Sequence, residues 1–182
     1  MNYREIGRTG MVVSELSFGC SSLGGVFRSV KEQEAIEAVF TAIECGINFL
    51  DVSPYYGYYK AETVLGKALK SIPRDKYYLS TKVGRYGKDG VNIWDYSAKR
   101  AKESVYESME RLNIDHIDLI NVHDIEFQAS LPGGTFICTG CRRLDIKRKV
   151  ITIGMTVLHF VPGLPGFCHL LRMVGNLIPP SL

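Results

Sequence analysis

Two hydrophobic patterns recur along the first 128 residues. Short strand-like runs stand at 15–19, 47–52, 77–83 and 117–123. Between them lie charged stretches in which apolar residues return every three or four positions, as on one face of a helix. Strands that alternate with helices of this length predict right-handed βαβ units and a parallel sheet. We therefore expect an α/β fold.

Local signals place further elements in this region. Residues 3–13 predict a hairpin around a glycine-flanked turn. Ser29 stands three residues before Glu32, the spacing of a capping box, and predicts the start of a first helix. A second helix is expected over 60–70, and Ser97 is positioned to cap a third.

Composition and charge restrict the class of protein. The chain has 182 residues, of which 46% are hydrophobic, so one domain can bury a sizeable core. The net charge of +3 is too small to indicate nucleic-acid binding. The polar N-terminus at 1–10 and an odd number of cysteines, five, favour a cytoplasmic location.

The composition changes near Gln128, which divides the chain into 1–128 and 129–182. The second region is read as a divergent tail with a fifth strand at 150–154. The uncharged stretch 150–171 is long enough for a membrane span, but its prolines and glycines argue against one. Open sheet edges in such a chain predict self-association.

Three side chains that handle protons follow three successive strands. Asp51, Lys82 and His123 end their runs, and Tyr56 follows Asp51 by five residues. Parallel strands with right-handed crossovers place their carboxyl ends on one side, so these side chains can converge. A tyrosine, whose pKa is about 10, donates a proton poorly unless a cation lowers that value, and the cation needs a carboxylate. The four residues together predict a catalytic site that protonates a carbonyl group as it receives a hydride.

The same residues carry a family resemblance. Asp51 to Gly57, Thr81-Lys82 and Val122-His123 resemble the Asp, Tyr, Lys, His tetrad of the aldo-keto reductase superfamily. Segments 63–69 and 107–112 resemble two of its helices, and segments 53–57, 82–86 and 123–127 are similar to the L-galactose dehydrogenase branch. The resemblance covers about residues 2–128 and returns briefly at 149–156.

The resemblance implies a fold and a reaction. Its fold is a (β/α)8 barrel, so this chain is expected to form an incomplete (β/α)8 barrel with an N-terminal hairpin, because a complete one needs about 250 residues. The implied reaction is oxidation or reduction between a carbonyl and an alcohol with NADP or NAD, on a small carbonyl compound or a sugar such as L-galactose. The alternative is a catalytically inactive truncated isoform or a binding fragment.

The resemblance also implies roles for single residues. Tyr56 would be the general acid, Lys82 would lower its pKa, Asp51 would pair with Lys82, and His123 would orient the substrate. The residues expected at the cofactor are Gly19, Cys20, Ser21, Asp51 and Thr156. Trp94 either walls the substrate pocket or covers the barrel rim.

A zinc site is the competing interpretation of the second region. Cys138 and Cys141 stand at a spacing common in zinc sites, and His159, Cys168 and His169 follow. The second half of this set is irregularly spaced, so no metal is predicted.

Overall fold

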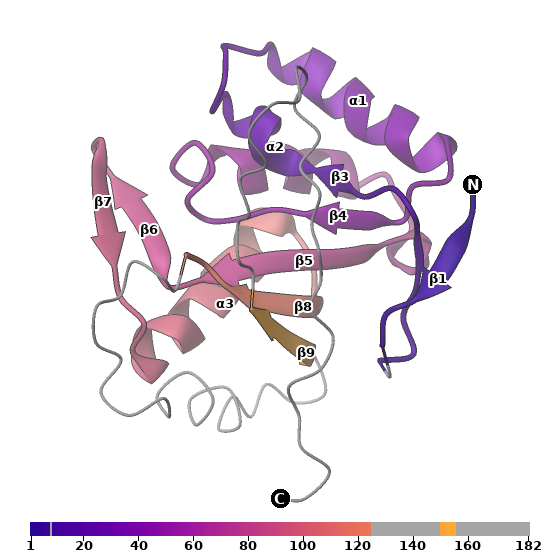
Figure 1. The fold of residues 1–182 in the computed structure, drawn as a ribbon. Coiled ribbons are helices and arrows are strands. Elements are labelled where there is room, and N and C mark those ends of the chain that lie inside the picture. The colour runs from indigo at the N-terminus through magenta and orange to yellow at the C-terminus, as the bar shows by residue number, and fades with distance from the viewer. Residues whose placement is uncertain (8, 125–149, 156–182) are drawn as a thin grey trace, which may run out of the picture.

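The computed structural model describes residues 1–7, 9–124 and 150–155. At its centre is a parallel sheet of five strands in the order β3-β4-β5-β8-β9 (Figure 1). The strands are β3 (Phe18–Gly19), β4 (Phe49–Asp51), β5 (Tyr78–Val83), β8 (Ile117–Val122) and β9 (Val150–Met155). β9 covers the positions where the sequence favours a fifth strand.

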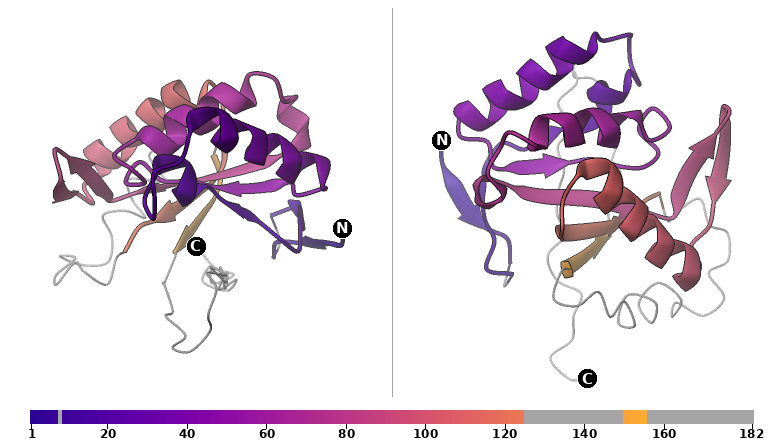
Figure 2. Two further views of the ribbon diagram at one scale, coloured as in Figure 1. Left: turned by 90° about the horizontal axis from the view of Figure 1, so that it is seen from above. Right: turned by 180° about the vertical axis from the view of Figure 1, so that it is seen from behind.

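Three helices cover one face of the sheet (Figure 2). They are α1 (Glu32–Glu44), α2 (Lys60–Leu69) and α3 (Ala98–Leu112). Two short 3-10 helices lie in the connections: η1 (Cys20–Gly24) between β3 and α1, and η2 (Arg74–Lys76) between α2 and β5. The apolar stripe of each helix packs on the strands, with Val39, Leu65 and Leu79 in one core cluster. Because side chains alternate along β5, the neighbours of Leu79 point to the opposite face.

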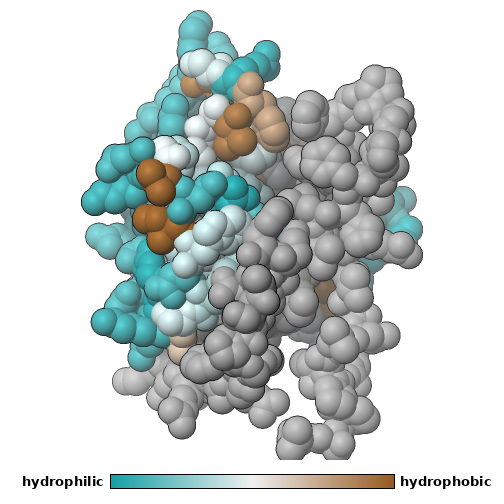
Figure 3. Space-filling view, turned by 60° about the vertical axis from the view of Figure 1, so that its left-hand side comes forward, coloured by the Kyte–Doolittle hydropathy of each residue, from teal (hydrophilic) through white to brown (hydrophobic). Residues whose placement is uncertain are grey.

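Two hairpins flank the central sheet. The predicted N-terminal hairpin is confirmed as β1 (Tyr3–Glu5) paired antiparallel with β2 (Val12–Ser14). A second hairpin, β6 (Arg85–Lys88) with β7 (Val91–Trp94), was not predicted from the sequence. Its signal is the Asp89-Gly90 pair, whose φ angles of 51° and 80° are those of a tight hairpin turn. Figure 3 views the molecule from this side, where the described surface is largely hydrophilic with small hydrophobic patches.

Of the two helix caps predicted from the sequence, the one at Ser97 is confirmed and the one at Ser29 is wrong. Ser97 does cap α3, since its hydroxyl oxygen accepts a hydrogen bond of 3.2 Å from the Arg100 amide. The capping box at Ser29 is wrong, because α1 begins at Glu32 after Lys31 and no side chain caps it. Spacing alone does not make a capping box; the backbone must also bring the two residues together at the helix end.

Several expectations for the second region concern residues outside those described. These are the candidate zinc ligands Cys138, Cys141, His159, Cys168 and His169, and also Thr156. Within the described ranges no helix is long and apolar enough to cross a membrane. The same part of the chain holds no cluster of three metal-binding side chains.

Candidate active site

The carboxyl ends of β4, β5 and β8 bring together the side chains that the sequence scatters. Asp51 ends β4, Lys82 stands near the end of β5, and His123 follows β8, where its amide donates 2.8 Å to the Val83 carbonyl. These three of the four tetrad residues are buried: Asp51 is 4% exposed, Lys82 2% and His123 3%. The expected convergence on one edge of the parallel sheet is therefore present.

Lys82 lies at the centre of the cluster. Its ammonium group forms an ion pair with Asp51 Oδ2 and donates a 3.1 Å hydrogen bond to the Val52 carbonyl. Burial lowers the pKa of Lys82, but the Asp51 carboxylate and the Tyr56 hydroxyl together raise that pKa above its ordinary value. Lys82 is thus a permanently charged group in a buried place.

Tyr56 is held in a strained loop between β4 and α2. Three consecutive residues, Gly57, Tyr58 and Tyr59, have positive φ angles of 60°, 51° and 73°. The loop lies against η1 so closely that a Cβ on Gly57 would stand 2.2 Å from the Gly24 carbonyl oxygen. This packing places the Tyr56 ring with its centre 5.0 Å from Lys82 Nζ and 5.7 Å from the His123 ring centre.

The pKa of Tyr56 moves opposite to the expectation from the sequence. Burial is the largest influence and raises the Tyr56 pKa, while the charge of Lys82 lowers it by a smaller amount. Asp51 also raises this pKa. The net result is a phenol that stays protonated at neutral pH, so Lys82 moderates the effect of burial and does not reverse it.

His123 is a neutral imidazole. Burial lowers its pKa to about 2, with further lowering from the positive charges of Lys82 and Arg85. Its Nδ1 lies 3.1 Å from the Ser53 hydroxyl oxygen, and its Nε2 lies 3.6 Å from Asp124 Oδ2. A neutral imidazole carries one N–H, which suits it to orient an oxygen atom by hydrogen bonding.

The β6–β7 hairpin docks beside His123 through Arg85. The Arg85 guanidinium donates a 2.5 Å hydrogen bond to Asp124 and lies 3.7 Å from the Tyr55 ring centre and 4.7 Å from that of Trp94. Trp94 therefore belongs to the group of side chains around the tetrad. The sequence assigned no role to Arg85 or Asp124, although they lie in the segments 82–86 and 123–127 that carry the family resemblance.

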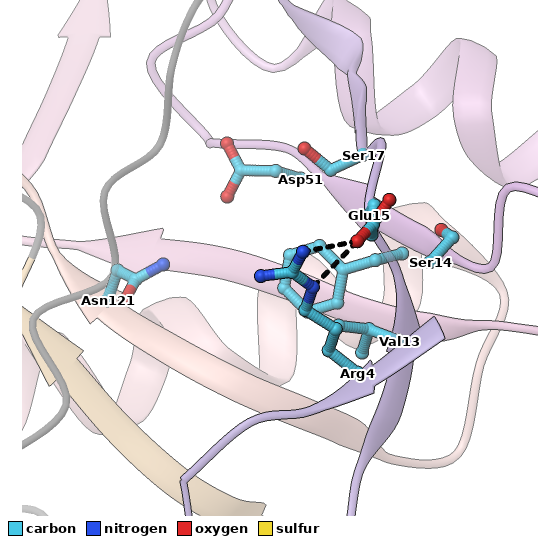
Figure 4. A pocket seen from close by; sticks show the side chains of 8 residues that line it. Arg4, Val13, Ser14, Glu15, Ser17, Asp51 and Asn121 are labelled. Carbon is cyan, nitrogen blue, oxygen red and sulfur yellow. Dashed lines mark hydrogen bonds and ion pairs between the residues drawn. The ribbon is translucent and has the colours of Figure 1, made fainter. Parts of the chain in front are cut away.

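A cavity of about 200 Å³ adjoins the tetrad on the sheet face opposite the helices (Figure 4). Asp51 and Asn121 line it together with side chains of the N-terminal hairpin region, where Arg4 and Glu15 form an ion pair. Asp51 Oδ1 is buried and accepts no hydrogen bond from the described residues. The tetrad thus borders a space that holds polar groups.

The residues that the sequence places at the cofactor differ in how accessible they are to a bound molecule. Gly19 is exposed, and a Cβ there would meet no described atom within 4 Å, while Ser21 is half-buried. Cys20 differs, because its side chain is completely buried in the core cluster and burial raises the pKa of its thiol. Cys20 could therefore border a cofactor only through its main chain, and Thr156 lies outside the described residues.

The family model for the aldo/keto reductase family matches residues 15–156. The chain belongs to the aldo/keto reductase family. Its fold is that family's barrel in part, as predicted: strands with helices on one face and an N-terminal hairpin. A putative aldo-keto reductase from Pseudomonas aeruginosa superposes with a TM-score of 0.74 at 28% identity, over 85% of this chain and 59% of that chain.

Curated members of the aldo/keto reductase family match over much of the chain. L-galactose dehydrogenase of Arabidopsis thaliana is 48% identical over 180 residues, which is 98% of this chain and 53% of that protein. D-arabinose 1-dehydrogenase of Saccharomyces cerevisiae is 38% identical over 86% of this chain and 47% of its own length. The chain spans about half the length of these relatives.

Proposed function

We propose that the chain provides the proton-handling side of an NAD(P)-linked reductase or dehydrogenase that interconverts a carbonyl and an alcohol on a sugar such as L-galactose. The observation that carries the proposal is the buried pair of Lys82 and Asp51 beside a protonated Tyr56. The two relatives named as sugar dehydrogenases support the substrate class. A location in the cytoplasm, without a nucleic-acid or membrane partner, is proposed with it.

Each tetrad residue has one step in the proposed mechanism. The nicotinamide, when bound, supplies or takes up the hydride. Tyr56 gives its hydroxyl proton to the carbonyl oxygen during reduction and takes a proton from the alcohol during oxidation. The charge of Lys82 stabilises the phenolate that forms, and Asp51 keeps Lys82 in place. Neutral His123 donates a hydrogen bond that orients the reacting oxygen.

The cofactor is proposed to be NADP or NAD, held near Gly19, Ser21 and Asp51. The cavity lined by Asp51 and the open position at Gly19 support this placement. Thr156 remains a prediction of the sequence. Self-association through the open sheet edges is likewise proposed.

The test follows NAD(P)H absorbance with both cofactors and with L-galactose or a simple aldehyde. It compares the 182-residue chain, a barrel of family length that carries residues 1–128, and the Tyr56→Phe variant of that barrel. We expect the barrel to turn over and Tyr56→Phe to lower kcat by about 10²–10⁴. An active Tyr56→Phe barrel would remove Tyr56 from the role of general acid.

The alternative is that the chain is an inactive truncated isoform or a binding fragment. Turnover by the 182-residue chain itself, lost in its Tyr56→Phe variant, would exclude this alternative. Background rates from the chain with an active barrel would favour it.

A further inference from the structure

Ser53 is buried in the loop after β4 and has a fixed set of neighbours. Its side chain is 0% exposed. Its hydroxyl oxygen accepts a 3.1 Å hydrogen bond from the Tyr55 amide and lies 3.1 Å from His123 Nδ1. The amide can only donate, so the hydroxyl oxygen is an acceptor on that side, and its single proton has one described partner left, the imidazole.

We propose that Ser53 is a positioning residue that fixes the tautomer of His123, donating its hydroxyl proton to Nδ1 so that the ring's own hydrogen stays on Nε2. This inference rests on the proposed function, in which His123 orients the reacting oxygen. The reverse arrangement, with Nδ1–H donating to Ser53, would give the hydroxyl oxygen two donors and leave its proton without an acceptor among the described residues. A buried donor without a partner is costly.

The surroundings of the other ring nitrogen agree with this assignment. Asp124 Oδ2 lies 3.6 Å from Nε2, so a negative charge faces the nitrogen that carries the hydrogen. The low pKa of His123 means that the ring has a single N–H to place. One hydrogen bond at Nδ1 therefore decides whether Nε2 is a donor or an acceptor toward the reacting oxygen.

The decisive measurement is the nitrogen-15 NMR spectrum of the histidine rings in the 182-residue chain. The chain has four histidines, and a His123→Asn variant assigns the resonance of interest. We expect Nδ1 of His123 to be unprotonated and hydrogen-bonded, and Nε2 to be protonated. A ring protonated at Nδ1 overturns the proposal.

Three variants separate this role from general packing. Ser53→Ala should shift the Nδ1 resonance to that of a nitrogen without a hydrogen bond, and Ser53→Thr, which keeps the hydroxyl group, should restore it. Ser80→Ala is the matched control, since Ser80 is also completely buried and accepts a 2.9 Å hydrogen bond from Asn121. It should leave the His123 resonances unchanged. An unchanged Nδ1 resonance in Ser53→Ala also overturns the proposal.

Turnover gives an independent readout in the barrel of family length. Ser53→Ala should lower kcat about tenfold or more with little change in KM, because an oriented donor acts on the transition state more than on bound substrate. Equal kcat in Ser53→Ala and the parent overturns the positioning role. The NMR result does not need turnover, so failure of the proposed reaction would be seen separately, in the Tyr56→Phe comparison.

Discussion

Strand β5 places buried charge networks on both of its faces at adjacent residues. Toward the helices, the Thr81 hydroxyl donates 2.7 Å to Glu62 of α2, and Arg111 of α3 donates 2.7 Å to the other Glu62 oxygen. Toward the opposite face, Lys82 pairs with Asp51. One network joins β5 to two helices, and the other lies at the candidate active site.

The two networks differ in how fully their carboxylates are satisfied. Both oxygens of Glu62 accept a hydrogen bond, whereas Asp51 Oδ1 accepts none from the described residues and Asp51 lines a cavity. A fully satisfied buried carboxylate fixes helices in place. A buried carboxylate with an oxygen that no described residue satisfies, beside a tyrosine whose pKa is raised, is typical of a reactive site. Burial and charge alone therefore do not distinguish these two carboxylates; the hydrogen bonds that they accept from the described residues and the cavity beside Asp51 do.

The largest expected effect is on kcat, which should depend on the Lys82–Asp51 network and not on the Glu62 network. Replacing both members of the inner pair, Lys82→Met with Asp51→Asn, should lower kcat of the family-length barrel by about 10²–10⁴, because no cation then stabilises the Tyr56 phenolate. The matched pair Arg111→Met with Glu62→Gln removes the same two charges from the helix side and should leave kcat within about threefold of the parent, since it touches no tetrad residue. NAD(P)H absorbance measures both. Equal losses in the two double variants would contradict the division.

The second prediction concerns the free energy of unfolding and the Glu62–Arg111 network that faces the helices. Arg111→Met leaves the completely buried Glu62 without its cation and should lower the free energy of unfolding by about 3–5 kcal/mol. Adding Glu62→Gln should recover most of this loss, because the uncompensated charge is gone. Urea unfolding followed by circular dichroism measures both. A double variant as unstable as the single one would show that packing, not charge, sets the cost.

The free energy of unfolding should fall at acid pH because His123 is buried as a neutral ring. The unfolded histidine takes up a proton near pH 6.5, whereas the folded ring stays neutral down to a pKa of about 2. Above pH 6.5 this group has no effect; as the pH falls, the unfolded chain binds the extra proton, which costs about 2 kcal/mol of stability at pH 5. His123→Asn should remove that part of the loss between pH 7.5 and 5 in urea unfolding. His116→Asn is the control, and an equal reduction there would contradict the assignment.

The smallest expected effect is on the free energy of unfolding when the Ser97 cap of α3 is removed. Ser97→Ala removes the hydroxyl group that accepts the Arg100 amide and should lower the free energy of unfolding by about 1 kcal/mol without changing the tetrad. Ser29→Ala should change it very little, because Ser29 caps no helix. Thermal unfolding of the two variants side by side measures the difference. A larger loss in Ser29→Ala would restore the capping box that the sequence suggested.

Sequence reasoning worked where the signal is local or periodic. The stripe of α2, the cap at Ser97 and the runs that became β5 and β8 follow from residue type and spacing. It failed at Ser29, where the spacing was right but the chain path was not. It missed the β6–β7 hairpin, although Asp89-Gly90 between two short runs is a recognised hairpin signal.

In the candidate active site, too, the sequence predicted some residues and not others. Asp51, Lys82 and His123 were predictable because parallel strands end on one side of the sheet. Ser53, Arg85 and Asp124 were not predicted, because their importance lies in contacts across 70, 39 and one residue of sequence. Residue type and spacing do not mark the two distant contacts in advance, and for Asp124 only its place beside His123 was a signal.

The sequence by itself determined the α/β pattern, the order of the tetrad residues and the strand ends that carry them. Those properties follow from hydrophobic periodicity and from the geometry of parallel strands, which are encoded along the chain. Only the tertiary structure decided the electrostatics. Burial outweighs Lys82 at Tyr56 and keeps His123 neutral, because the free energy of a charge depends on how much water the surrounding fold excludes.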